Sequence, residues 1–220
     1  MVFALACPKE TEAPHKRKGG ARVTLSPAML ARAMIVMTAA AVTSSVLFNF
    51  TTNGNGQLLT ERFHGIMEDP ATLGILMALV YAVASLAQVV VGNLVNRFAL
   101  KPFFMCMVLG QIPMLWLASQ AQGWALFAAL LGLMIFVFGA IPFTDVMIAR
   151  YVDDRSRSRV SGMRLGVSFA VSSASVWAIG PVVKAMGFGN SLLILACFSV
   201  VTLTILTLLP GAKEETVVAA

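Results

Sequence analysis

The sequence contains little charge and few cysteines. Of its 220 residues 12% are charged and 58% are hydrophobic, whereas soluble domains carry about 25% charged and roughly 45–50% apolar residues. This composition excludes an ordinary soluble domain, because folding alone would leave too much apolar surface in water. The three cysteines, Cys7, Cys106 and Cys197, are widely spaced and form no CxxC pair. That spacing argues against a disulfide framework or a zinc site.

Catalytic motifs are also missing. The two histidines, His15 and His64, have no acidic or thiol partner at motif spacing, and the sequence has no GxSxG, HExxH or Gly-rich phosphate loop. We therefore expect no enzyme activity, no cofactor and no metal. The formal charge of +6 is spread over short patches between hydrophobic runs. Such patches indicate membrane topology and predict no nucleic-acid partner.

Six apolar runs are each about the 20 residues that a helix needs to cross a bilayer. We therefore predict an all-α integral membrane fold in which residues 27–210 form a bundle and residues 211–220 a cytoplasmic tail. Asp69 before Pro70 and Asn190 are expected as N-caps, and Pro181 with its preceding glycine as a kink. The predicted transmembrane helices are 27–51, 70–95, 102–119, 124–150, 158–184 and 190–210.

The distribution of basic residues predicts how the six spans are oriented in the membrane. Fourteen of the 16 Lys and Arg residues fall on one side of the six spans, and only Arg62 and Lys184 fall on the other. The positive-inside rule then predicts a multi-pass protein of the inner (plasma) membrane with both termini in the cytoplasm. Residues 1–26 are expected to be the end of a preceding helix plus a cytoplasmic linker. The chain would then come either from a truncated or split reading frame or from a standalone membrane module.

The segment between the second and third runs carries a recognisable pattern. A cytoplasmic signature of the major facilitator superfamily reads Gly-x-Leu-Ala-Asp-Arg-x-Gly-Arg-Lys. This segment resembles it, with Asn96 at the acidic position, Ala99 at the second glycine, and matches at Gly92, Leu94, Arg97 and Lys101. The resemblance implies the carboxy-terminal six-helix half of a bacterial secondary transporter. Such a half would move a small solute by alternating access, as a proton-coupled symporter or antiporter.

One half cannot enclose a solute site. The resemblance therefore implies a further partner: the missing amino-terminal half, another chain or a second copy. It also implies that the motif loop latches neighbouring helices, and that the first, second, fourth and fifth helices line the cavity. The basic loop 150–159 contains Asp153, Asp154 and Arg155. These charges are expected either to exchange partners during alternating access or to be a solvated anchor.

Asp145 is the only acidic residue inside an apolar span, and Arg164 lies at a similar depth in the next one. An ionisable residue inside a membrane is a functional hypothesis by default. Three interpretations stay open for Asp145. It couples protons, it forms an ion pair with Arg164, or both side chains reach the cytoplasmic interface.

Uncharged polar side chains supply the candidates for a solute pathway. Ser168, Ser172 and Ser175 follow Arg164 at helical spacing, so they share one helix face. A second polar stripe, formed by Tyr81, Ser85 and Gln88, precedes Gly92 on another helix. Close helix packing is the alternative to ligand binding. Near the end of the first run, the sequence Gly54-Asn55-Gly56 is expected to be either broken backbone or an exposed turn. The pathway candidates are Asn49, Asn53, Tyr81, Ser85, Gln88, Ser168 and Ser172.

A different class of function remains open. The chain would then be a non-transporting membrane scaffold, or a truncated remnant that inserts and moves nothing. A membrane enzyme ranks last, because only Asp145 and Arg164 place ionisable groups at one depth. Further hydrophobic spans encoded upstream of Met1 would favour the transporter.

Overall fold

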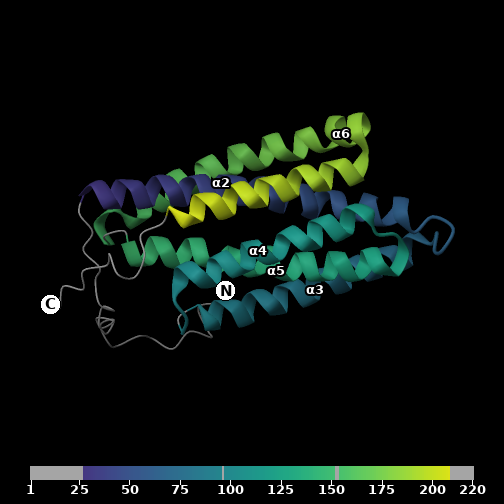
Figure 1. Cartoon of the computed structure of the whole chain (residues 1–220), viewed down its shortest axis with the longest axis horizontal. Helices are drawn as coiled ribbons and strands as arrows, with labels where there is room; N and C mark the ends of the chain where they lie inside the picture. The colour runs from purple at the N-terminus through teal and green to yellow at the C-terminus, as the bar shows by residue number, and fades with distance from the viewer. Residues whose placement is uncertain (1–26, 96, 152–153, 209–220) are drawn as a thin grey trace, which may run out of the picture.

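A computed structural model describes residues 27–95, 97–151 and 154–208, and this part of the chain consists of helices joined by short connections, with no strand. The predicted all-α class is therefore confirmed for these residues. Each helix contains a stretch long and apolar enough to cross a membrane. Figure 1 shows the helices running roughly along one common axis. They are α2 (Pro27–Arg62), α3 (Pro70–Leu94), α4 (Leu100–Gln120), α5 (Gly123–Tyr151) and α6 (Asp154–Thr207).

Within its described ranges the structure has five helical elements, where six separate helices were predicted. The difference lies in α6, whose 54 residues are interrupted only by Gly187, at φ 76° and ψ 167°. Figure 1 shows the chain turning back at this break, so that the green part before it and the yellow part after it run in opposite directions. We refer to them as the first segment (154–186) and the second segment (188–207) of α6. Gly180 and Pro181, where the sequence predicts a kink, lie inside the first segment, and the break in helical backbone comes later, at Gly187.

Side chains after the break stabilise the reversal. Asn190 is not the predicted N-cap but lies within the helix, where its Nδ2 donates to the Met186 carbonyl at 3.0 Å. The Ser191 hydroxyl donates to the Gly187 carbonyl at 2.7 Å. Phe188 is buried at 2% exposure. Carbonyls at a helix end need such partners, so the chain reverses at one glycine without a longer loop.

Helix α2 is longer than predicted. The end expected at Thr51, and the broken backbone or turn at Gly54-Asn55-Gly56, are wrong, because the helix continues to Arg62. Its last turns are anchored by side chains in the core, with Leu58 and Leu59 at 1% and 0% exposure. This burial overrides the low helix propensity of the two glycines. Thirty-six residues make a helix about 54 Å long.

Helix α3 begins as the sequence indicates. Asp69 is its N-cap, Pro70 follows in the first turn, and the carboxylate accepts hydrogen bonds from the backbone N–H groups of Ala71 and Thr72. The Thr72 hydroxyl also donates to this carboxylate. These bonds, led by the Thr72 hydroxyl, lower the pKa of Asp69 below its usual 3.8.

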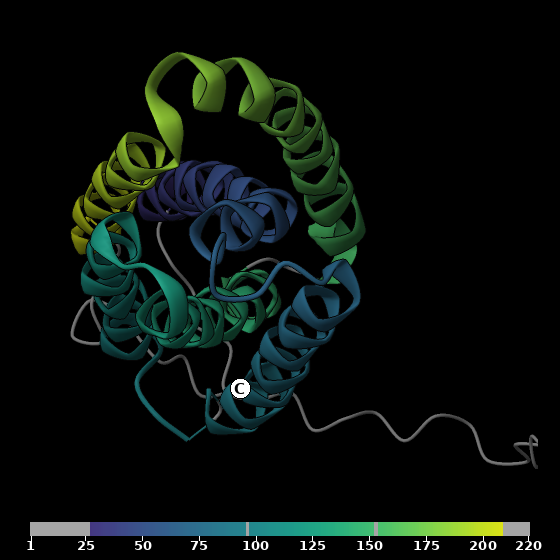
Figure 2. The same ribbon diagram turned by 90° about the vertical axis from the view of Figure 1, so that its right-hand side faces the viewer.

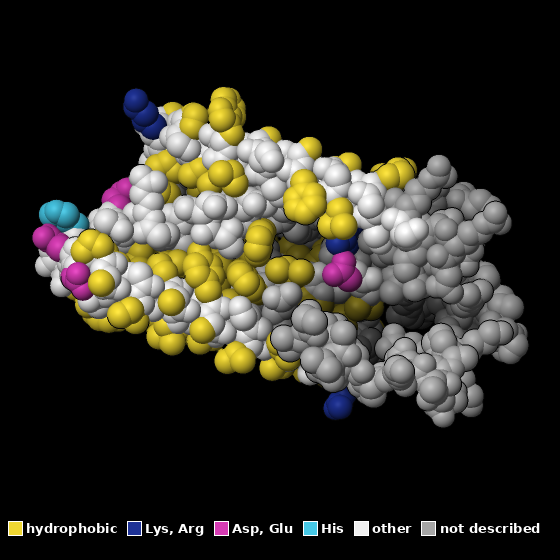
Figure 3. Space-filling model, turned by 180° about the vertical axis from the view of Figure 1, so that it is seen from behind, with side chains coloured by type: hydrophobic (Ala, Val, Ile, Leu, Met, Phe, Trp, Pro, Cys, Tyr) yellow, Lys and Arg dark blue, Asp and Glu magenta, His cyan; other side chains and the backbone are white. Residues whose placement is uncertain are grey.

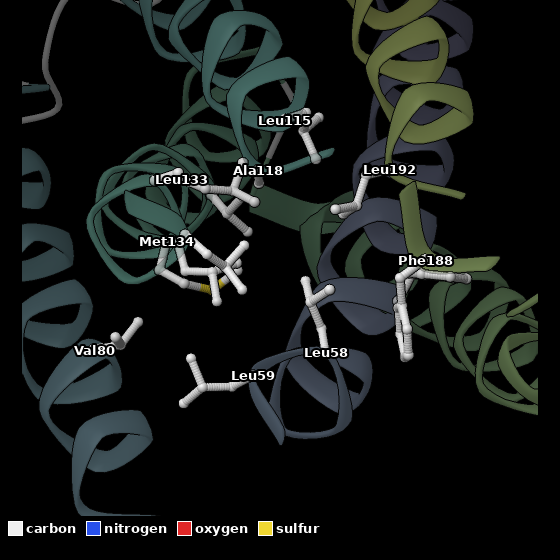
Figure 4. Packing of buried hydrophobic residues seen from close by; sticks show 14 of the residues in the cluster. Leu58, Leu59, Val80, Leu115, Ala118, Leu133, Met134, Phe188 and Leu192 are labelled. Atoms are coloured by element: carbon white, nitrogen blue, oxygen red, sulfur yellow. The ribbon is translucent and has the colours of Figure 1, made fainter. Parts of the chain in front are cut away.

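The helices pack as a bundle around α5 and α2. Helix α5 lies against α3 and α4, while α6 lies against α2 and α4 and touches α5 only slightly. The end-on view of Figure 2 shows this arrangement, with the first segment of α6 at the outside. One core cluster joins α2, α3, α4, α5 and both segments of α6, the first segment through Ile179. Figure 4 shows Leu58 and Leu59 of α2 directed towards Leu133 and Met134 of α5.

A second core cluster lies at the opposite end of the bundle. Its centre is the stacked pair Phe104 and Phe143, whose ring centroids are 4.9 Å apart. The outer surface is apolar along the middle of the bundle, with exposed side chains such as Leu86 and Trp177. Figure 3 shows hydrophobic side chains over the middle of one face. Such a surface suits lipid rather than water.

Candidate functional site

Two of the predicted pathway residues form a hydrogen bond between helices. Asn49 Nδ2 on α2 donates to the Ser172 hydroxyl on the first segment of α6 at 2.8 Å. The same nitrogen lies 2.8 Å from the Ser45 carbonyl, its second acceptor. Ser168, one turn before Ser172, is half-buried, and Ser175, one turn after, is buried. The predicted serine stripe of α6 therefore faces α2.

A second polar contact joins α2 to α3. The Tyr81 hydroxyl donates to the Thr52 carbonyl at 2.8 Å. Beside it lies the Asn55 side chain, which is only 1% exposed. The Asn55 Nδ2 has no hydrogen-bond partner among the described residues. Buried amide donors are usually bonded, and the Tyr81 hydroxyl oxygen beside this nitrogen is positioned to accept from it.

The other pathway candidates are spread over a wider area. Asn53 Nδ2 donates to the Asn49 carbonyl at 2.8 Å and stays on α2. On α3, Ser85 is exposed and Gln88 is half-buried. Within the described residues α3 and α6 do not pack against each other. The structure thus brings together the α2 and α6 candidates and, separately, Tyr81 and α2, but it leaves Ser85 and Gln88 apart.

Asp145 of α5 and Arg164 of α6 form an ion pair, which was one of the three interpretations of these residues. Arg164 Nη2 lies 2.7 Å from Asp145 Oδ1. The two side chains differ in burial, with 19% of Arg164 and 68% of Asp145 exposed. Arg164 Nη1 is buried and has no partner among the described residues. The arginine is therefore enclosed by the protein, while the carboxylate lies at the opening.

The motif segment lies at the same end of the bundle as this ion pair. Gly92 faces Pro142 of α5, since a Cβ placed on Gly92 would lie 3.9 Å from the proline ring. Arg97 is exposed. Lys101 Nζ donates to the carbonyl of Thr207, at the end of α6, at 2.8 Å. A cation at a helix C-terminus is favourable, so this lysine ties α4 to α6.

Some predicted gating residues lie outside the described part of the chain. Asn96 and Asp153 are among them, as are the expected linker 1–26 and the tail 211–220. Asp154 and Arg155 form the start of α6, but their side chains are not described. The exchange of charged partners in this loop therefore stays a prediction.

Several polar contacts have no signal in the sequence. Buried Gln111 of α4 accepts a hydrogen bond from Ser199 of α6, with their side-chain oxygens 3.5 Å apart. Thr202 of α6 donates to Thr43 of α2 at 2.6 Å. Helical spacing identifies a polar face, but it does not say which helix lies against that face. Among described residues, no group of three His, Cys, Asp or Glu side chains could hold a metal ion.

Together these features define the class: over the residues that the structure describes, the chain is helical, with five helices long and apolar enough to cross a membrane. No family model matches the sequence, and no curated protein or solved structure shows significant similarity to it.

Proposed function

We propose that the chain is the second half of a secondary active transporter of the major facilitator type, in the inner (plasma) membrane with both termini in the cytoplasm. In this role α6 supplies two transmembrane segments, which makes six spans in all. The protein moves a small solute by alternating access, coupled to protons as a symporter or antiporter. The support comes from the motif segment 92–101 and from polar side chains that meet inside apolar helices.

The contact between Asn49 and Ser172 carries this proposal. Both side chains lie well inside apolar stretches, in the spans Met34–Arg62 and Ser161–Thr207. Polar groups in such positions usually face protein or a water-filled pathway. Asn49 keeps a carbonyl oxygen, and Ser172 keeps a hydroxyl hydrogen, with which to bind an uncharged polar group of a solute.

In alternating access, a solute shifts the populations of two orientations because it binds them unequally. Asn49 and Ser172 change their hydrogen-bond partners if α2 and α6 move relative to each other. Closing the site requires the missing half, a partner chain or a second copy of this chain. The ion pair of Asp145 and Arg164 supplies the charged groups for coupling.

The test is transport by the protein in liposomes, together with any six-span polypeptide encoded directly upstream. Solute and proton fluxes are followed under an imposed pH gradient, over a panel of labelled sugars, amino acids and organic acids. We expect uptake or efflux of at least one solute, and its loss in Ser172→Ala.

Ser173→Ala is the matched control. Ser173 is exposed and its hydroxyl donates to the Phe169 carbonyl of its own helix, so transport should persist. Absence of any solute or proton flux would favour the scaffold or remnant. Equal loss in both serine variants would contradict the proposed role of Ser172.

A further inference from the structure

We propose that the first segment of α6 is a hinged arm. Gly187 is its hinge, and the ion pair between Asp145 and Arg164 is the bond that holds it against α5. When this bond opens, the arm moves away from α5 and uncovers the polar side chains between α2 and α6. The movement takes place within this one chain, so the inference does not depend on transport.

The part of the arm far from the hinge has little apolar packing towards the bundle, because Ser175 is the only buried side chain among the described residues 161–178. The contacts of the arm with the core are made by Ile179, Val182 and Val183, close to the hinge. Helix α6 touches α5 only slightly, and the face of the arm towards α2 carries the serine stripe and the contact between Ser172 and Asn49. Its large side chains point the other way, with Met163, Phe169 and Trp177 at 68%, 67% and 78% exposure. Elements with few buried apolar contacts open most easily.

The hinge has the backbone geometry that rotation requires. Gly187 lies at positive φ, and no atom outside its immediate neighbours lies within 4 Å of the position a Cβ would take. Hinges absorb movement at a few residues in such positions. Two side-chain bonds, from Asn190 to Met186 and from Ser191 to Gly187, hold the observed reversal.

The ion pair is placed to act as the closing bond. It lies far along the arm from Gly187, so a small rotation at the hinge separates Asp145 from Arg164 by a large distance. Its unequal burial predicts unequal effects of substitution. Loss of Asp145 leaves a mostly enclosed guanidinium without a counter-charge, which is costly. Loss of Arg164 leaves a mostly exposed carboxylate, which is tolerated.

Cysteine labelling of the full chain in native membranes tests the arm. The background carries Cys7→Ser, Cys106→Ser and Cys197→Ser, and the reporter is Ser168→Cys, at a half-buried position of the arm. The measured quantity is its rate of reaction with a membrane-impermeant maleimide. We expect Asp145→Asn to raise this rate about 5- to 30-fold, and Arg164→Gln to raise it less.

Two controls separate the arm from a general loosening of the fold. The exchange Asp145→Arg with Arg164→Asp should return the rate to within about twofold of the parent, because the pair forms again in reverse. Glu61→Gln should leave the rate unchanged, because Glu61 is exposed at the other end of the bundle. An unchanged rate in Asp145→Asn, or no recovery in the exchanged pair, would overturn the proposal.

A comparison of ionic strengths covers the case in which Asp145→Asn does not fold. The Asp145 side chain of the pair is 68% exposed, so salt screens its attraction to Arg164. The Ser168→Cys reporter with the pair intact should therefore react faster at high than at low ionic strength, and this difference should be absent in Arg164→Gln. Equal rates at the two ionic strengths with the pair intact would also overturn the proposal.

Discussion

A close approach between α4 and α5 yields a stability prediction that needs no knowledge of function. At Gly110 of α4, a Cβ would lie 2.5 Å from the nearest ring carbon of Phe136 on α5. The glycine therefore lets the aromatic ring lie directly on the α4 backbone. Small residues at helix contacts allow this kind of approach in membranes. Gly110→Ala requires the ring to move by about 1 Å.

The magnitude follows from two opposing effects. Forcing an extra methyl group into a packed contact costs about 1–3 kcal/mol. Replacing glycine by alanine within a helix contributes about 0.5–1 kcal/mol in the opposite direction. We therefore expect Gly110→Ala to lower the free energy of unfolding by about 0.5–2 kcal/mol. Gly74→Ala on α3 is the control, because nothing lies within 4 Å of its Cβ position, and it should be neutral or stabilising.

Reversible unfolding in mixed detergent micelles, followed by circular dichroism, measures both variants. Phe136→Leu combined with Gly110→Ala should recover part of the loss, because the smaller side chain leaves room for the methyl group. Equal stability of Gly110→Ala and Gly74→Ala would refute the close contact between α4 and α5.

Three further substitutions test other parts of the fold. Gly187→Ala should destabilise the protein by about 1–3 kcal/mol in the same unfolding assay, since its backbone conformation is open essentially only to glycine, whereas Gly180→Ala should not. Tyr81→Phe should cost about 1 kcal/mol through loss of the hydrogen bond to Thr52, and an unchanged unfolding midpoint would contradict that bond. Asp69→Asn should remove a pH dependence of stability. Because the pKa of Asp69 is lowered in the folded state, its charged cap stabilises the fold above the usual pKa of 3.8 and is lost as the pH falls through the folded value; identical acid titrations of parent and variant would contradict this.

Much of the helical architecture follows from local signals in the sequence. Asp69 and Pro70 mark the start of α3, and the turn at Gln120–Gly123 separates two apolar runs as predicted. The end of α2 was missed because the sequence Gly54-Asn55-Gly56 has poor helix propensity. Packing of Leu58 and Leu59 against other helices decides the outcome there, and such burial depends on residues far away in the chain.

The candidate site shows the same limit. The serine stripe of α6 was visible from its spacing, but its partner Asn49 is 123 residues away from Ser172. Local patterns in a single sequence do not show which helices far apart in the chain become neighbours. The pairing of Asp145 with Arg164 was within reach because consecutive helices often lie side by side. The sequence assigns Lys101 to a loop motif but does not predict its hydrogen bond to the Thr207 carbonyl. That bond depends on where the end of α6 lies relative to α4.

The bond from Lys101 to Thr207 has a practical consequence for work with this protein. The second segment of α6 is connected to the first segment at Gly187 and is bonded to α4 near its other end, through Lys101. A fusion partner or surface tether at the carboxyl end would pull on the bond between Lys101 and Thr207. This force would act on the start of α4 and on the adjoining segment 92–101. Attachment before α2 avoids this route, so it is the better choice for immobilising the chain.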